Sequence, residues 1–500
     1  SDANCPDGGV QIDVGVDDDD NGVLDSNEID QTTYICNGAD GADGSDGADG
    51  SASPNTMLTS VSTPTLEDCS SGGRIIEQGL DNGDGGGTSQ NGVLESGEVD
   101  YTTTYCSNFV VSAIADIRSG SNSGYAYEIA VMGTRLYFNA RDGSTGYELW
   151  AYETTNDSTW LVANIRSGDS SAYPNDIVVM GSRLYFEATD GSTGTELWAH
   201  EAKNDSTWQV ADINSGPTSG GADHITVMGT RLYFEATDGS TGYELWAHES
   251  TNDSTWQVAD IYSGINSGYA NDIVVMGSRL YFEATDGSTG VELWAHETTN
   301  NSTWQVADIN SGGQGYANDI VVMGSRLYFE ARDGSTGYEL WAHESTNDST
   351  WQVADIYSGS NSGYANGIVV MGSRLYFEAR DGSTGYELWA HESTNDSTWQ
   401  VADIYSGPNS GQADHITVMG NRLYFQADDG SNGPELWVHD PANGSTWMAS
   451  NICGDPVGCA WGLYISNMVS VGDRLYFDAE DPIRTKELWM MKIEHTITYS

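Results

Sequence analysis

The sequence predicts an all-β protein whose main part is an eight-bladed β-propeller of four-stranded repeats, preceded by two small modules. Glu-Leu-Trp follows every copy of the string Leu-Tyr-Phe, which begins at residues 136, 184, 232, 280, 327, 375, 423 and 475. The copies are spaced by 47 or 48 residues, and once by 52. Each repeat contains four short runs of β-branched and aromatic residues, separated by clusters of Gly, Asn, Asp and Ser.

One repeat illustrates the four expected strands, which cover residues 272–276, 279–284, 292–296 and 303–309. A β-solenoid is the alternative architecture, but its coils are usually shorter and do not need three tight turns and one long connection. The predicted organisation is a first module, a Gly/Asp-rich linker, a second module and the propeller, at residues 1–37, 38–64, 65–107 and 108–500.

The ends of the propeller carry a signature of ring closure. Residues 109–117 match the fourth strand of a repeat through Ala-Asp-Ile, yet the other three strands do not precede them. We expect this strand to complete the last blade, whose own tail at 495–499 competes for the same edge or flanks it. Such an exchange removes an exposed strand edge.

The composition excludes several classes of function. Among the 500 residues, 74 are acidic and 18 are basic, which gives a net charge of −56. A chain this negative repels phosphate backbones and anionic lipids, so we expect no nucleic-acid partner. No apolar run approaches the roughly 20 residues of a membrane-spanning helix, so we expect no membrane insertion. The chain is 38% hydrophobic and 10% aromatic, which argues against disorder.

The cysteines and the first residues favour an exported protein at the cell surface or outside the cell. The chain begins Ser-Asp-Ala with no initiator Met, which is typical of a processed mature chain. Three local disulfides are the simplest arrangement of the six cysteines, pairing Cys5 with Cys36, Cys69 with Cys106, and Cys453 with Cys459.

The first module contains a predicted calcium site. Residues 17–28 fit the loop pattern D-x-[DN]-x-[DN]-G-x₅-E at every specified position. The expected oxygen ligands are Asp17, Asp19, Asn21, the carbonyl of Val23, Asp25 and Glu28. The alternative is a solvated acidic turn without a metal ion.

A second copy of this plan lies in the second module, with residues inserted between its early and late ligands. Calcium as the cofactor there would use Asp81 or Asp84 with Asn91, Val93, Glu95 and Glu98. Between the modules, residues 38–50 carry Gly at every third position. A flexible or extended linker is favoured over a collagen trimer, since those triplets contain no proline.

The order of strands in a blade sorts the loops onto two faces. The Asp-Gly-Ser-Thr-Gly turns and the connections between blades share one face, which is the candidate ligand face for glycans or cations. Its aspartates are Asp142, Asp190, Asp238, Asp286, Asp333 and Asp381. The alternative is that each Asp only closes its own hairpin.

The opposite face carries a repeated Asn-x-Ser triplet. These candidates for N-glycosylation are Asn156, Asn204, Asn252, Asn300, Asn347, Asn395 and Asn443. The alternative is that Asn suits a tight turn and was copied with the repeat.

A histidine recurs after the Trp of six repeats, and we expect these histidines to pack between sheets, because equivalent positions stand too far apart for one metal ion. They are His200, His248, His296, His343, His391 and His439. The last repeat departs from the pattern at 481–486 and carries the Cys453–Cys459 segment just before, which suggests a specialised contact.

Residues 232–246, Leu-Tyr-Phe-Glu-Ala-Thr-Asp-Gly-Ser-Thr-Gly-Tyr-Glu-Leu-Trp, are similar to the ELWxxDGT repeats of large secreted proteins. The resemblance covers about 118–490 and departs from the family after Trp, where Ala-His-Glu-Ser-Thr-Asn-Asp-Ser-Thr-Trp replaces Asp-Gly-Thr. It implies an exported propeller-like protein and brings no catalytic residues with it. The modules similarly resemble Cys-bounded acidic loops found beside collagen-like runs in exported microbial proteins.

The expected function is that of a non-enzymatic, structural or adhesive subunit of an extracellular assembly, a filament or a lattice, that is stabilised by calcium and disulfides and forms by self-association. The alternative is a multivalent, lectin-like propeller that binds glycans. A propeller glycosidase is a third reading, but near-identical repeats do not offer the unlike acid, base or nucleophile that an enzyme needs.

Overall fold

The computed structural model describes residues 9–15, 26, 29–36, 56–119, 122–450, 464–480 and 486–500. The regular secondary structure of the described chain is β-strand, apart from one 3₁₀ turn, η1 (Asp84–Gly86). The predicted all-β propeller fold is therefore confirmed. Within these ranges, no helical segment has the length and apolar character needed to span a membrane.

The chain divides into two compact units. The first unit comprises residues 1–61, 76–103 and 499–500, and the second comprises 62–75 and 104–498. The first contains the hairpin of β1 (Gly9–Gly15) and β2 (Ile29–Cys36), and strands β3 (Met57–Ser62) and β4 (Gly72–Leu80) each have residues in both units. The predicted second module, 65–107, thus contributes residues to both units.

The second unit is built from a series of antiparallel sheets that we number 1 to 8 in chain order. Their first strands are β6 (Tyr127–Met132), β10 (Asn175–Met180), β14 (Asp223–Met228), β18 (Asn271–Met276), β22 (Asn318–Met323), β26 (Asn366–Met371), β30 (Asp414–Met419) and β34 (Ser466–Val471). Their second strands are β7 (Arg135–Ala140), β11 (Arg183–Thr189), β15 (Arg231–Ala236), β19 (Arg279–Thr285), β23 (Arg326–Ala331), β27 (Arg374–Ala379), β31 (Arg422–Ala427) and β35 (Arg474–Ala479).

The third strands each carry Glu-Leu-Trp, and the fourth strands lie at the outer side of each sheet. The third strands are β8 (Glu148–Glu153), β12 (Thr195–Glu201), β16 (Glu244–Glu249), β20 (Val291–Glu297), β24 (Glu339–Glu344), β28 (Glu387–Glu392), β32 (Glu435–Asp440) and β36 (Glu487–Tyr499). The fourth strands are β9 (Ser158–Ala163), β13 (Ser206–Ala211), β17 (Ser254–Ala259), β21 (Ser302–Ala307), β25 (Ser349–Ala354), β29 (Ser397–Ala402), β33 (Ser445–Ser450) and, for sheet 8, β5 (Val99–Ala115).

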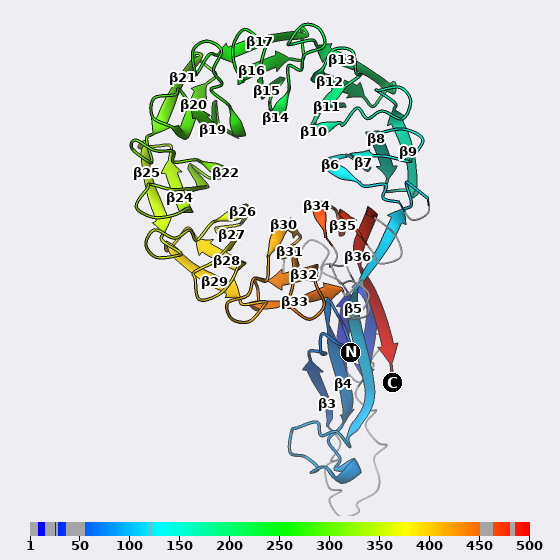
Figure 1. The fold of residues 1–500 in the computed structure, drawn as a ribbon. Coiled ribbons are helices and arrows are strands. Elements are labelled where there is room, and N and C mark those ends of the chain that lie inside the picture. Colours follow the sequence, from blue (N-terminus) through cyan, green and yellow to red (C-terminus); the bar gives the residue numbers. More distant parts are fainter. Residues whose placement is uncertain are drawn as a thin grey trace, which may run out of the picture. The chain divides into compact units, whose positions relative to one another are not determined.

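The sheets form a closed ring with the first strand of each at the centre (Figure 1). Each first strand contacts the first strand of the next sheet, and β34 of sheet 8 contacts β6 of sheet 1. The ring is therefore continuous across the two ends of the second unit.

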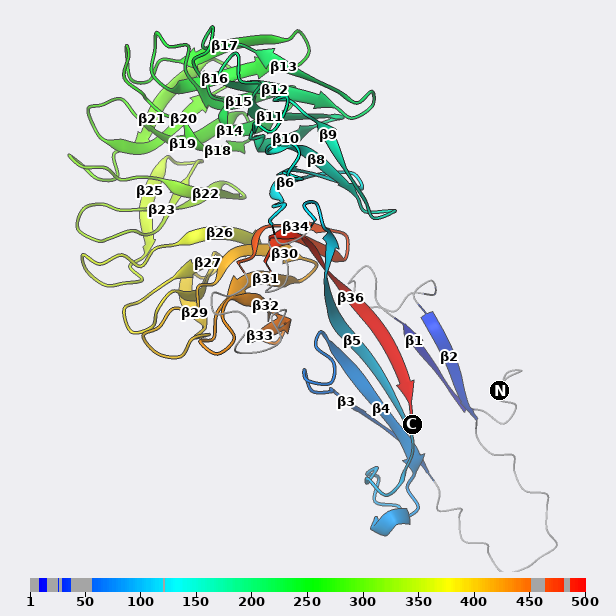
Figure 2. The same cartoon turned by 45° about the vertical axis from the view of Figure 1, so that its right-hand side comes forward.

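Closure uses the strand that the sequence predicted for it. In sheet 8 the order of strands is β3-β4-β5-β36-β35-β34, so β5 occupies the place of the missing fourth strand beside β36 (Figure 2). The predicted tail, 495–499, continues β36 and flanks this edge. The predicted disulfide between Cys69 and Cys106 is present and ties β5 to the segment before β4. Nearby, the Trp447 indole donates to the carbonyl of Ser70, which joins that segment to sheet 7.

The Leu-Tyr-Phe strands are apolar on both sides because each sheet is covered by a neighbour on both faces. In sheet 4, Leu280 and Phe282 pack against Tyr233 and Leu245 of the preceding sheet. The intervening Tyr281 points the other way and packs against the next sheet. Neighbouring residues of a strand thus fill successive cores around the ring, so the apolar run is continuous rather than alternating.

The turn between the second and third strands lies against the connection between sheets, and glycine makes this close approach possible. A Cβ atom on Gly242 would lie 2.0 Å from the carbonyl oxygen of Asn266 and 2.5 Å from the Cα atom of Ser267. These neighbours are backbone atoms that cannot rotate away. Gly242 therefore fixes how closely the turn of sheet 3 approaches the connection that follows it.

We predict that Gly242→Ala lowers the free energy of unfolding by about 1–3 kcal/mol, as overpacking does. The matched control is Gly277→Ala, where φ is +63° and nothing lies within 4 Å of the new Cβ atom. The control should cost only the left-handed backbone penalty of about 1 kcal/mol. Denaturation midpoints of the two variants measure the difference, and equal midpoints would contradict the packing argument.

Candidate functional site

The Asp-Gly-Ser-Thr-Gly turns and the connections between sheets lie on one face, as predicted. Tyr147, which follows the first turn, stacks on Tyr173 of the connection, with ring centroids 5.4 Å apart. The amide of Tyr147 donates to the Ser171 hydroxyl of the same connection at 3.0 Å. We call this side of the ring the tyrosine face.

The aspartates of the turns are occupied by their own loops. Asp142 accepts hydrogen bonds from the amides and hydroxyls of Ser144 and Thr145, at 2.7 to 3.0 Å. Burial raises the pKa of Asp142, but these bonds outweigh it and lower the pKa to about 2. The same loop bonds hold Asp190, Asp238, Asp286, Asp333 and Asp381. Each carboxylate thus closes its hairpin, and a ligand would have to compete with bonds already made.

Tyrosines and arginines form stacked clusters on the tyrosine face. The Arg141 guanidinium lies 5.0 Å from the Tyr125 ring centroid and 4.8 Å from that of Tyr147. Arg332 and Arg380 make the same pairs of contacts in sheets 5 and 6. The connection tyrosines have left-handed backbones, with φ between 51° and 57°, at Tyr125, Tyr173, Tyr269, Tyr316 and Tyr364. Tyr173 and Tyr269 are 51% and 44% exposed, which leaves ring surface open to a ligand.

A central cavity of about 570 Å³ lies where the first strands meet, and acidic and histidine side chains line it. In β10, pairing with β11 shifts register between Asn175 and Val178, so Asp176 is bulged out of the ladder with φ of 50°. Residues at the equivalent position of the other sheets also have positive φ: Glu128, His224, Asp272, Asp319, Gly367, His415 and Asn467.

Hydrogen bonds between these left-handed residues, which form the rim of the central cavity, connect one sheet to the next. The Asp176 carboxylate accepts the His224 amide at 2.9 Å, and Asp319 accepts the Gly367 amide at 3.1 Å. Asp272 likewise accepts the Asp319 amide at 3.2 Å. A non-glycine residue in the left-handed conformation costs about 1–3 kcal/mol of conformational free energy. In the rim this conformation accompanies hydrogen bonds from backbone amides to carboxylates of the preceding sheet. Burial raises the pKa of Asp176 and Asp319.

Two further sets of buried glutamates hold the ring together. Glu244, at the start of the third strand, accepts the amides of Ile261 at 2.6 Å and Gly268 at 2.9 Å. Burial outweighs these bonds and raises the pKa of Glu244 to about 7. On the second strand, Glu330 accepts the Ala365 amide of the next sheet at 3.2 Å, and burial likewise raises its pKa to about 7.

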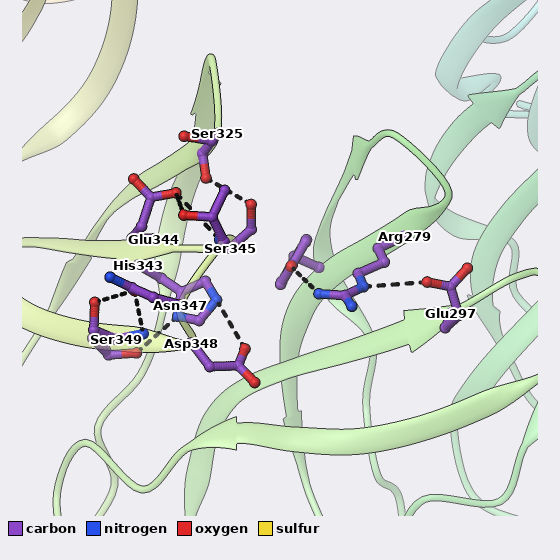
Figure 3. A network of polar contacts seen from close by, with 12 residues as sticks. Arg279, Glu297, Ser325, His343, Glu344, Ser345, Asn347, Asp348 and Ser349 are labelled. Carbon is purple, nitrogen blue, oxygen red and sulfur yellow. Dashed lines mark hydrogen bonds and ion pairs between the residues drawn. The ribbon is translucent and has the colours of Figure 1, made fainter.

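The opposite face carries the histidines and the ion pairs (Figure 3). His343 is fully buried, bonds the Thr350 hydroxyl through Nδ1 at 2.9 Å, and lies 5.7 Å from the Tyr281 ring of the preceding sheet. Burial lowers its pKa. The histidines therefore pack between sheets, as predicted. Nearby, Arg279 pairs with Glu297 at 3.2 Å.

The predicted glycosylation sites lie at exposed turns of this opposite face. The side-chain oxygen of Asn347 accepts the amide and the hydroxyl of Ser349, at 3.1 and 2.6 Å (Figure 3). Asp348 between them has φ of 59°. The same amide bond recurs at Asn156, Asn204, Asn252, Asn300, Asn395 and Asn443. The triplet thus has a structural role in each turn, and glycosylation stays a prediction.

The second acidic loop folds around two buried carboxylates. Asp81 accepts the amides of Asn91 and Gly92, at 3.2 and 2.8 Å. Glu98 accepts the amides of Gly83 and Glu95, at 2.6 and 3.2 Å.

Two of the remaining predicted ligands of this loop also accept hydrogen bonds within it. Glu95 accepts the Thr88 amide, Asp84 accepts the Asn82 side chain, and Val93 is exposed. Across the described ranges, no three His, Cys, Asp or Glu residues are grouped so that they could hold a metal ion. Calcium binding by this loop stays a prediction.

Several predicted site residues lie outside the described residues. They are the first calcium loop (Asp17, Asp19, Asn21, Val23, Asp25 and Glu28), Cys5, and the pair Cys453 and Cys459. The glycine-rich segment 38–50 lies outside as well, and Cys36 is described only as the last residue of β2.

The rim of the central cavity was not predicted from the sequence. Its residues differ from sheet to sheet, so they carry no constant motif, and only the bulge in each first strand aligns them. The sequence signal that could have found them is the variable residue before the Ile of each first strand (Met468 in the last), which is acidic, histidine, glycine or asparagine.

Comparisons with known proteins add little beyond the fold. A family model described as a domain of unknown function, DUF7151, matches residues 1–36. No curated protein matches the chain. Similar solved structures include a puromycin hydrolase (12% identity, TM-score 0.46, 74% of this chain and 60% of that chain) and a puromycin-hydrolyzing peptidase of Mycobacterium tuberculosis (9%, 0.47, 74% and 60%). An oligogalacturonate lyase of Vibrio parahaemolyticus is also similar (8%, 0.40, 77% and 98%).

The chain spans about 60% of the length of the two puromycin-cleaving proteins. At these identities and TM-scores, the similarities bear on neither activity nor ligand. The candidate site must therefore be judged from its own residues.

We predict that stability falls as the pH rises from 6.5 to 8.5. Burial raises the folded-state pKa of Glu244 and Glu330 to about 7, above the ordinary value of 4.5. A carboxyl group whose pKa is raised by folding stabilises the fold below its unfolded pKa, and this contribution is lost as the pH rises through the folded pKa. The lowered pKa of the buried histidines acts below this window, at pH under 6.5.

Guanidinium chloride midpoints, measured at about 1 M salt to screen surface charge, test this prediction. Glu244→Gln should weaken the pH dependence. Glu249→Gln is the control, since hydrogen bonds, first of all from Thr251, lower the pKa of Glu249 to about 2, far below the window. A midpoint that is constant or rises with pH would show that the buried carboxyls do not control stability.

Proposed function

We propose that this chain is a non-enzymatic exported surface protein that serves as a structural or adhesive subunit of an extracellular assembly. The observation that carries the proposal is that the repeated acidic and histidine side chains are engaged in contacts within the fold. Acidic and histidine side chains recur at equivalent positions of the ring, and most of them are engaged in bonds that hold the fold.

Three repeated positions illustrate this use. Asp142 and its equivalents close turns, Glu244 and its equivalents bind the amides of a connection, and His343 and its equivalents pack between sheets. General acid–base catalysis needs a positioned group that can exchange a proton with substrate. Groups that are saturated by backbone amides serve the scaffold instead, which supports a binding or structural role over catalysis.

The disulfide supports an extracellular location. Cys69 and Cys106 are bonded, and disulfides persist in oxidising compartments. The bond lies where β5 enters sheet 8, so it secures the strand that closes the ring. Calcium bound by the first acidic loop would add a second means of stabilising the small first unit.

Self-association is part of this proposal, through a contact between unlike surfaces of neighbouring molecules. A contact between the first unit of one molecule and the propeller of the next would be heterologous, and such contacts extend into filaments or lattices when they do not close. The net charge of −56 opposes such contacts unless cations offset it.

A second candidate function is multivalent glycan binding, and the stacked tyrosines favour it. Exposed ring faces such as that of Tyr173 offer an apolar surface to the C–H face of a sugar, and several weak sites on one ring would bind with avidity. A propeller glycosidase is the third candidate, and no described group favours it over the other two.

For the assembly proposal, we predict that the purified full chain forms filaments or lattices in electron microscopy when calcium is present. Removal of calcium with a chelator should disperse them, because the acidic loops would then repel one another. Addition of magnesium instead of calcium is the control. Monodisperse rings at every calcium concentration would contradict the proposal.

For glycan binding, we predict that the full chain binds immobilised oligosaccharides and that Tyr147→Ala, Tyr173→Ala and Tyr338→Ala together weaken binding about tenfold through lost avidity. Tyr338 is the tyrosine after the turn of sheet 5, and its ring centroid lies 4.9 Å from the Arg332 guanidinium. Tyr101→Ala is the control, since Tyr101 is 66% exposed and belongs to the first unit, whereas the tyrosine face is built from the second. Equal binding by the triple variant would rule out the tyrosine face as the binding surface.

A further inference from the structure

The repeat pattern breaks at several positions that lie together in sheets 6 and 7. Gln412 stands where most other connections carry tyrosine, and Gly367 stands where most first strands carry a carboxylate or a histidine. Asp414 begins β30, as Asp223 begins β14, whereas the equivalent residue is asparagine at 175, 271, 318 and 366. The glycine at 367 next to Gln412 and Asp414 distinguishes sheets 6 and 7 from sheet 3, which shares the Asp-His pair.

Gln412 and Asp414 line a cavity of about 620 Å³ on the tyrosine face. Its walls include Glu378, Tyr386, Gln412, Asp414, His415 and Lys486, from sheets 6, 7 and 8. Asp414 and His415 also line the central cavity, so the two hollows adjoin. Small-molecule sites in proteins are typically hollows of about 300–1,000 Å³ with a few convergent polar groups, which this cavity matches.

Glu378 differs from its equivalents in the bonds that it makes. Glu235, Glu283 and Glu330 each accept an alanine amide of the next sheet, at 3.0 to 3.2 Å. Within the described part of the chain, no such bond joins Glu378 to Ala413, and burial raises the pKa of Glu378 to about 7, with the Asp414 charge adding to the shift. Its carboxyl group therefore faces the cavity without the structural bond of its equivalents.

The chain of bonds around the rim is also broken here. In sheets 3, 5 and 6 a rim amide bonds the carboxylate of the preceding sheet, as the Gly367 amide does with Asp319. Gly367 has no side chain to bond the His415 amide, which donates to Asp414 at 2.7 Å instead. The His415 ring and the second oxygen of Asp414 lie 3.8 Å apart, beside the cavity.

The chemistry of the walls selects a neutral, hydroxyl-rich ligand. Carboxylates accept hydrogen bonds, whereas a glutamine side chain both donates and accepts, which suits hydroxyl groups. Tyr386 adds an aromatic ring, one side of which lies against the Arg380 guanidinium, 4.9 Å from the ring centroid. An anion is disfavoured by Glu378 and Asp414, because the cation of Lys486 is already paired with Asp478 at 3.1 Å.

We infer that this cavity binds one saccharide unit of a neutral glycan, with hydroxyls bonded by Glu378, Asp414 and Gln412 and an apolar sugar face on Tyr386. The inference rests on the glycan-binding candidate and is independent of the assembly proposal. It assigns a single site per chain, in contrast to the several sites of the stacked tyrosines.

The test compares matched variants of the full chain. Asp414→Asn and His415→Asn introduce residues found at the same positions of other sheets, so the fold should be retained. The controls are Asp223→Asn and His224→Asn in sheet 3, which has the same Asp-His-Ile-Thr sequence. There Glu187 keeps its bond to the Ala222 amide and is bonded to Asp223.

Binding is measured on an array of immobilised neutral oligosaccharides, followed by calorimetric titration with the one that binds most tightly. We expect the titration to contain one site per chain whose affinity is about tenfold or more lower in Asp414→Asn and His415→Asn, with no comparable loss for the controls. An array without binding overturns the inference, as do equal affinities for all four variants. If Asp414→Asn retains binding that the Tyr147, Tyr173 and Tyr338 variant loses, the tyrosine face binds glycans and the cavity does not.

Discussion

Each repeat depends on the buried glutamate that begins its third strand. Glu244 accepts amides from both ends of the connection that leads to the next sheet, at Ile261 and Gly268. A connection would otherwise carry these amides unpaired into a buried site, which costs free energy. By satisfying them, the glutamate sets the path of the connection and so the place where the next first strand begins.

Much of the tyrosine face follows from this bond. The held connection places Tyr269 beside the turn of its own sheet, where its amide bonds the carbonyl of Tyr243. The same path requires Gly242, because the connection passes too close for a Cβ atom. The aromatic surface offered to a ligand is therefore a product of the same interaction that spaces the sheets.

A ring of repeats must also join its two ends, and this chain does so by pairing a strand from before the first repeat with the third strand of the last repeat. Strand β5 is much longer than the other fourth strands and pairs with β36, which carries the last Glu-Leu-Trp. The exchange leaves the last repeat free to vary, since it is held by strand pairing and by the nearby disulfide. The departures in sheets 6 and 7 lie close to this closure, where Lys486 of sheet 8 reaches the cavity.

The sequence by itself determined the strands, their order, the faces of the loops and the closing strand. Each of these follows from local patterns, such as Leu-Tyr-Phe, Asp-Gly and the unpaired fourth strand at 109–117, that recur at a constant period. The disulfide of Cys69 and Cys106 was also readable, because it bounds a local segment.

Only the tertiary structure decided which polar side chains are hydrogen-bonded within the fold and which face a cavity. The turn aspartates and Glu244 are acidic residues in the sequence, but their bonds to amides depend on how loops approach one another. Glu378 and Glu330 stand in the same motif, and only the next sheet distinguishes them, since it bonds one and not the other among the described residues. A pattern within one repeat cannot encode a contact made between two repeats, which is why the candidate site emerged from the packing of sheets.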